Sequence, residues 1–179
     1  MTKGGARNRS GPLPSEDSAR SESRGYKLDA LPAAGYDGPV PDFPLPRRAV
    51  MRWEYEDKRR YQVVDAEATA GVAERERELW AWAWRTPQAC AWALPSESWR
   101  LYTVAMWVRT FVLCESSEAT AADKGSLHRF ADQIGMTTAG LAEMGWKITS
   151  DAKPASTPEP AKAAPGGSRL RALNGGLAG

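Results

Sequence analysis

Histidine and cysteine are scarce in this sequence, which limits the chemistry its side chains can perform. His128 is the only histidine, and the basic Arg129 follows it, so we expect neither a two-histidine metal site nor a Ser-His-Asp triad. Cys90 and Cys114 are the two cysteines, and their apolar surroundings suit a core position. Because two cysteines form no disulfide framework, we expect a protein of the reducing cytosol that binds no metal.

Long apolar runs and phosphate-binding loops are also missing. No stretch approaches the roughly 20 apolar residues that span a bilayer, and the N-terminus lacks the apolar core of a signal peptide. No glycine-rich loop ends in Lys-Ser or Lys-Thr, and most acidic residues lie in charge runs beside basic partners. These absences predict a soluble protein that is not an enzyme, has no cofactor and has no membrane partner.

Composition divides the chain into four parts. Residues 1–25 are rich in Gly, Ser, Arg, Pro and Glu and predict a flexible basic N-terminal arm. Residues 26–46 contain five prolines among apolar residues, which favours an extended strap over the protein's own helices or over a neighbouring subunit. Residues 47–148 are predicted to be the helical core and oligomerisation domain. Residues 149–179 are rich in Ala, Pro and Gly and predict a disordered tail, with a possible docking motif at 168–177.

Helical patterns cover most of the core and predict an all-α fold, a small helical bundle. Arg47 to about Ala70 follows a proline, and Glu54 with Lys58 and Glu56 with Arg60 are spaced as i,i+4 ion pairs of a helix. Further helices are expected at 74–85, at 88–94, from 97 to about 116, and from a Thr120–Asp123 capping box onward.

The helix predicted from residue 97 is apolar around most of its circumference. Such a helix has to be buried on most sides, and a domain of this size has few ways to do that alone, so we infer packing between subunits. Six tryptophans (80, 82, 84, 92, 99 and 107) fit core and interface better than base stacking, which needs exposed rings beside a basic groove. The predicted oligomer interface consists of Leu101, Val104, Val108, Phe111 and Val112.

Residues 127–148 predict two helices joined by a tight turn. Gly135 suits a left-handed helix end, Thr137 or Thr138 can cap the second helix, and Gly145 can end it. This helix-turn-helix-like hairpin could read DNA bases, or it could serve packing and subunit contact. The second helix offers no Arg, Lys, Asn or Gln to a base edge, and Glu143 would repel phosphates, so the packing alternative stays open.

Basic residues cluster although the net charge is only +2. The first ten residues contain three bases and no acid, and residues 47–60 contain six bases against three acids. Such clusters suit a polyanionic partner, although they can also serve solubility alone. The candidate DNA-binding residues, chosen on charge, are Lys3, Arg7, Arg9, Arg47, Arg48, Arg52, Lys58, Arg59 and Arg60.

The order of several segments resembles the small terminase subunits of tailed bacteriophages that infect actinobacteria. The resemblance covers residues 4–148, and its most specific parts are LWAWAWRTPQACAW at 79–92 and the stretch 132–146. Residues 47–74 form a longer charged insertion than that family usually shows, and the tail after Ser150 has no counterpart.

The resemblance implies a non-catalytic homo-oligomer, a ring, that binds double-stranded viral DNA and delivers it to the large terminase subunit for genome packaging. Its site of action would be the cytoplasm of the infected bacterial host. Two alternatives remain at this stage. One is a helix-turn-helix transcriptional regulator, and the other is a structural phage assembly protein without DNA binding.

Overall fold

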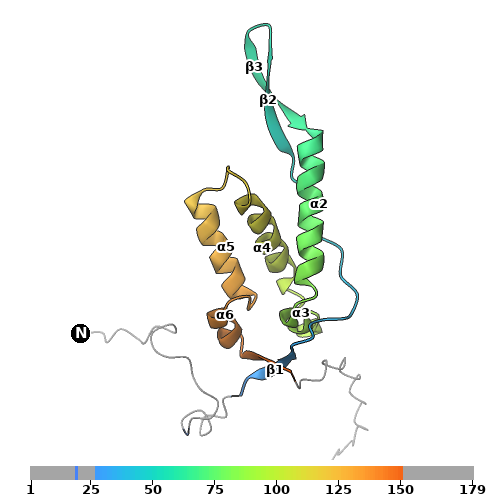
Figure 1. Ribbon diagram of the computed structural model, residues 1–179, viewed down its shortest axis with the longest axis vertical. Helices are drawn as coiled ribbons and strands as arrows, with labels where there is room; N and C mark the ends of the chain where they lie inside the picture. Colours follow the sequence, from blue (N-terminus) through green and yellow to red (C-terminus); the bar gives the residue numbers. More distant parts are fainter. Residues whose placement is uncertain (1–18, 20–26, 151–179) are drawn as a thin grey trace, which may run out of the picture.

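The fold combines helices with two small sheets, as the computed structural model shows for Ala19 and residues 27–150 (Figure 1). The prediction of an all-α fold is therefore wrong, because each sheet contains two strands that the sequence analysis placed in a helix or in irregular chain. The strands are β1 (Asp29–Pro32), β2 (Val50–Glu56), β3 (Arg59–Asp65) and β4 (Trp146–Thr149). The helices are α2 (Ala66–Ala83), α3 (Pro87–Trp92), the 3₁₀ turn η1 (Pro95–Glu97), α4 (Arg100–Cys114), α5 (Ala121–Gln133) and α6 (Thr138–Glu143).

The helix predicted from Arg47 is replaced by an antiparallel β-hairpin of β2 and β3. Its residues alternate in the period-two manner of a strand, and the i,i+4 charge spacing that suggested a helix spans the turn instead. Asp57 and Lys58 form this turn with φ values of 47° and 63°, the left-handed geometry of a two-residue type I′ turn. A helix begins only at Ala66, where the Asp65 carboxylate accepts a hydrogen bond from the Ala68 amide (2.9 Å).

The second sheet joins the two ends of the described chain. β1 pairs in parallel with β4, with Asp29 opposite Trp146 and Pro32 opposite Thr149. The proline-rich chain after β1 then runs along α2, where the Trp80 indole donates to the Pro41 carbonyl (2.7 Å) and the Phe43 ring packs edge-on against Trp80. This segment therefore packs on its own subunit's helices.

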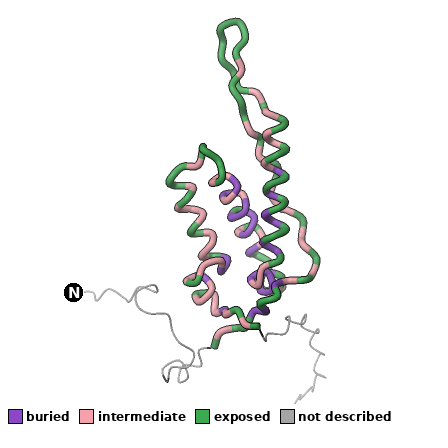
Figure 2. Tube along the Cα trace, in the orientation of Figure 1, coloured by how far each residue is buried: buried purple, intermediate pink, exposed green. Residues whose placement is uncertain are grey.

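Tryptophans fill the core between α2, α3 and α4. Trp80, Trp84 and Trp92 form a chain of edge-to-face contacts with centroids 5.6–5.8 Å apart, and Trp107 is also buried. Four of the six tryptophans weighed above thus lie in the core. Trp82 and Trp99 remain 54% and 60% exposed. Figure 2 shows that burial is confined to the helical body and its small sheet, whereas the β-hairpin has no buried residue.

Three side chains from α3 and α4 bind the carboxyl end of α5. The carbonyl oxygens of Gln133, Ile134 and Gly135 accept hydrogen bonds from Arg100 (2.5 Å), Trp92 (3.0 Å) and Gln88 (3.1 Å), respectively. The last carbonyls of a helix have no partner within it, so these bonds satisfy groups that would otherwise be buried without one. They fix the turn between α5 and α6 to the body.

Several local predictions are confirmed in this region. Thr120 and Asp123 form the capping box of α5, and Thr137 caps α6 by accepting from the Gly140 amide (2.9 Å). Gly135 and Gly145 have φ values of 76° and 75°, as expected for left-handed helix ends. By contrast, α2 runs without a break through residues 71–73, where the predicted helices were separate, and α4 begins at Arg100 after η1 and not at residue 97.

Lys58→Gly should stabilise the β-hairpin, because glycine adopts the left-handed turn conformation without the steric cost that a side chain incurs there. We expect a gain of about 1 kcal/mol, seen as slower amide hydrogen exchange in β2 and β3. Lys124→Gly in α5 is the matched control and should lower stability by about 1 kcal/mol. Faster exchange in the β-hairpin of Lys58→Gly would contradict the turn assignment.

Candidate nucleic-acid interface

The structure brings six of the nine predicted DNA-binding residues to one projecting element. Arg47 and Arg48 lie directly before β2, Arg52 lies on β2, Lys58 in the turn, and Arg59 and Arg60 on β3. Lys3, Arg7 and Arg9 lie outside the described residues. The β-hairpin extends beyond the end of α2 and away from the helical bundle, so its tip is accessible (Figure 1).

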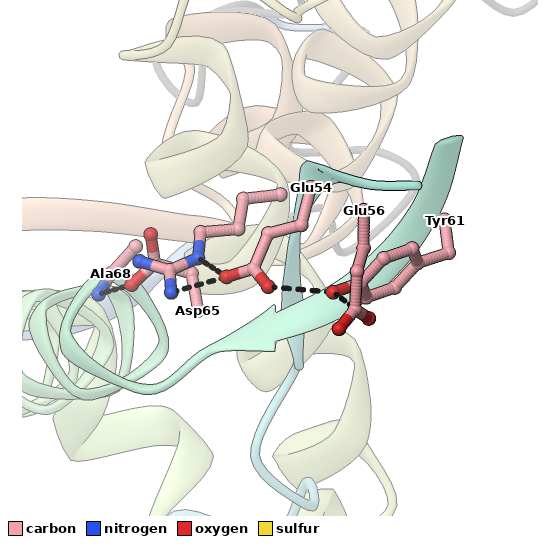
Figure 3. Close-up of polar contacts among 6 residues, drawn as sticks. Glu54, Glu56, Tyr61, Asp65 and Ala68 are labelled. Carbon is pink, nitrogen blue, oxygen red and sulfur yellow. Dashed lines mark hydrogen bonds and ion pairs between the residues drawn. The ribbon is translucent and has the colours of Figure 1, made fainter. Parts of the chain in front are cut away.

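One face of the β-hairpin, here called the charged face, carries all the acidic residues of β2 and β3. Strand register places Arg52, Glu54, Glu56 and Tyr61 on it, together with Arg59 opposite Glu56. The Arg52 guanidinium binds Glu54 at 2.6 Å and 3.0 Å, and the Tyr61 hydroxyl donates to Glu54 (3.3 Å) and Glu56 (3.4 Å), as Figure 3 shows for the labelled carboxylates. Arg52 is therefore largely neutralised, and this face would repel phosphates.

The opposite face, here called the aromatic face, carries no carboxylate. It consists of Met51, Trp53, Tyr55 and Val64, together with Arg60 and Gln62. The Arg60 guanidinium lies 3.6 Å from the centre of the Trp53 ring, a cation–π contact that leaves its charge uncompensated.

Positive charge without a carboxylate partner is concentrated at the tip. Among the described residues, Lys58, Arg59 and Arg60 form no ion pair, and all three are exposed. At the base, Arg47 is exposed, while the buried Nε of Arg48 has no hydrogen-bond partner. The tip is thus the part of the β-hairpin best suited to a phosphate backbone.

The geometry of α5 and α6 favours the packing alternative for the helix-turn-helix-like segment. α6 has only six residues, and its solvent-exposed positions are Thr138 and Glu143. Gly140 lies so close to α5 that a Cβ atom there would come within 2.3 Å of the Asp132 carbonyl oxygen. The contact between the helices is therefore a tight internal one, and α6 presents no Arg, Lys, Asn or Gln side chain to a base edge.

The predicted interface residues of α4 face the chain's own core. Val104 and Val108 are completely buried and Val112 nearly so, while Phe111 packs against Trp107. Leu101 is half-buried and lines a shallow apolar pocket of about 250 Å³ with Trp84, Trp92 and other residues. The single chain thus buries the apolar side of α4 that the sequence analysis assigned to a second subunit, because α2, α5 and the proline-rich segment cover it.

Within the described part of the chain, no group of His, Cys, Asp and Glu residues could hold a metal ion. No helix there is long and apolar enough to cross a membrane. The buried Glu76 binds Arg109 at 2.7 Å and 3.1 Å, and Arg109 also donates to the Pro46 carbonyl, so this pair ties the chain just before the β-hairpin to α2 and α4. Comparisons with protein-family models, curated proteins and solved structures find no match to this chain.

Glu54→Gln should lower the pKa of Tyr61. Partial desolvation, the negative charge of Glu54 and the hydrogen bonds to Glu54 and Glu56 raise this pKa above its ordinary value, because each disfavours the phenolate. A neutral glutamine removes the charge repulsion, so the tyrosine should ionise at lower pH in an ultraviolet titration referenced to Tyr61→Phe. Glu67→Gln in the first turn of α2 is the control, and an unchanged Tyr61 pKa in Glu54→Gln would contradict the charged-face geometry.

Proposed function

We propose that this protein is a non-catalytic DNA-binding protein whose β-hairpin contacts the duplex. The observation that supports this most is the placement of Lys58, Arg59 and Arg60 at the tip of an arm that stands clear of the body. Basic side chains so placed can approach a phosphate backbone without a clash between the body and the DNA.

More particularly, we propose a small terminase subunit of a tailed bacteriophage. In this role, a homo-oligomeric ring binds viral DNA and delivers it to the large terminase subunit in the cytoplasm of the infected bacterium. Two features support this proposal. One is the resemblance of residues 4–148 to that family, and the other is the basic tip of the β-hairpin. Several arms in one ring would add weak contacts to the same duplex by avidity.

Dimensions also support contact between the arm and DNA. A two-stranded ribbon fits a major groove about 12 Å wide, and the tip offers three exposed cations, Lys58, Arg59 and Arg60, that form no ion pair within the described residues. The contacts of Lys58 and Arg59 would be to phosphates, which strengthen binding and its salt dependence without reading sequence. Any sequence preference would then come from DNA shape.

The alternatives are less well supported. A helix-turn-helix regulator would have to read bases with α6, whose exposed positions are a threonine and a glutamate, with no Arg, Lys, Asn or Gln. A structural assembly protein would leave the unpaired cations of the tip without a role, and it predicts no DNA affinity.

The double variant Lys58→Gly/Arg59→Gln should bind duplex DNA more weakly and with a flatter salt dependence. Each lost phosphate contact lowers the slope of log K against log salt by about 0.9, so each engaged subunit should lose roughly 2. Glycine at position 58 suits the turn, so lost affinity cannot be attributed to an unfolded β-hairpin.

The matched control is Lys124→Gln/Arg129→Gln on α5, which removes the same charge from exposed positions outside the β-hairpin. Titrations of a labelled duplex over a range of salt concentrations measure both slopes. If only the α5 variant flattened the slope, DNA would bind at the helix pair and the proposal would be wrong. A wild-type protein with no DNA affinity would favour the assembly-protein alternative.

A further inference from the structure

Exposed apolar side chains gather in two groups on this chain. Of ten large apolar residues that are exposed among the described residues, four form the aromatic face of the β-hairpin and three lie at the start of α4. These three, here called the α4 stripe, are Trp99, which directly precedes α4, and Tyr102 and Met106 within it. Large contiguous apolar patches on a protein surface commonly mark interaction sites.

The aromatic face is unusual for an isolated β-hairpin in water. Met51, Trp53 and Tyr55 follow one another on the same side of β2, with 44%, 49% and 73% of their surface exposed, and Val64 lies opposite Met51. A two-stranded hairpin is marginally stable on its own. Packing this face against another surface would therefore stabilise the arm as well as remove apolar area from water.

The α4 stripe follows from helical spacing. Trp99, Tyr102 and Met106 are separated by three and four residues, so they share the side of α4 opposite to the buried Val104 and Val108. The Arg100 guanidinium lies 4.2 Å from the centre of the Trp99 ring. No other described element covers this side of the helix, since Tyr102 remains 60% exposed.

The two surfaces cannot meet within one chain. The β-hairpin extends past the amino-terminal end of α2, whereas the α4 stripe begins beside η1 and α3, at the opposite end of the body (Figure 1). A contact between the two surfaces would therefore have to form between two copies of the chain.

We propose that the aromatic face of one subunit packs on the α4 stripe of the next, an inference that rests on the oligomer of the proposed function. The lengths agree, because Met51 to Tyr55 spans about 14 Å of strand and Trp99 to Met106 spans about 11 Å of helix. Neither surface carries an exposed carboxylate among its own residues, so the contact buries no unpaired acid. A contact between two different surfaces is head-to-tail, and such contacts form a ring when the rotation between subunits closes.

The size of the surfaces favours a ring over an isolated pair. The four exposed apolar side chains of the aromatic face, two of them aromatic, have roughly 100 Å² each left to bury, so this face supplies roughly 400 Å². A stable pair usually buries about 800 Å² on each partner. A subunit in a closed ring uses both surfaces at once, which doubles its buried area.

The test measures the mass of the full chain by light scattering on a size-exclusion column. Trp53→Ser/Tyr55→Ser removes the aromatic face, and Tyr102→Ser/Met106→Ser removes the stripe, so each variant should fall from the wild-type oligomer to a monomer. Two matched controls should keep the wild-type mass. They are Trp82→Ser, a tryptophan of similar exposure outside both surfaces, and Tyr61→Phe, on the charged face of the same β-hairpin. Near-ultraviolet circular dichroism from the buried tryptophans verifies that each variant is folded.

Mixing the two double variants gives the sharpest result. Each retains the surface that the other has lost, so a head-to-tail contact predicts a one-to-one heterodimer and nothing larger. A contact between two aromatic faces predicts no heterodimer, and that result would overturn the proposal.

Two further outcomes would also overturn it. The first is a wild-type mass in both double variants. The second is a Trp53→Ser/Tyr55→Ser variant that keeps its mass but loses DNA affinity, which would place the aromatic face against DNA. Because mass and DNA affinity are measured separately, failure of this interface can be distinguished from failure of DNA binding.

Discussion

The hydrogen bonds to the carboxyl end of α5 are the constraint on which the helical body depends. Arg100, Trp92 and Gln88 bind three successive carbonyls, and Gly135 then turns the chain so closely that a Cβ there would meet the Trp146 ring. These contacts direct the chain through α6 into β4, which pairs with β1. Because these contacts hold the turn between α5 and α6 against α3, α4 and β4, the two helices form part of the body's internal packing.

Because α5 and α6 pack against the rest of the body, the surfaces available to other molecules lie elsewhere. The β-hairpin has three such surfaces, which are a carboxylate-bearing face, an aromatic face and a basic tip. The ion pair between Glu76 and Arg109, with its hydrogen bond to Pro46, fixes the chain entering the hairpin. The base of the β-hairpin is therefore connected to both α2 and α4.

Sequence reasoning succeeded where local chemistry decides the structure. The capping box at Thr120, the Thr137 cap and the glycine turns follow from a few neighbouring residues and were predictable. The β-hairpin was missed because a spacing of four residues does not distinguish a helix from a short turn. Glu54 precedes Lys58 by four residues, and Glu56 precedes Arg60 by four, and both intervals cross the turn. The Trp, Tyr and Val residues of 50–64 were the signal that favoured strands. The burial of Val104 and Val108 within one chain could not be predicted, since periodicity identifies an apolar stripe without saying what covers it. Charge clustering identified the basic character of residues 47–60. It could not predict the two faces of the β-hairpin, because strand register alone determines which side chains share a face.

The central claim is that the β-hairpin, and not the helix pair, contacts DNA. Amide hydrogen exchange measured with and without a duplex tests it most directly, because both elements are followed in the same sample. The account predicts that exchange slows on DNA binding in residues 50–65 and stays unchanged in residues 127–145. Slower exchange in the helix pair, with the β-hairpin unchanged, would contradict the account.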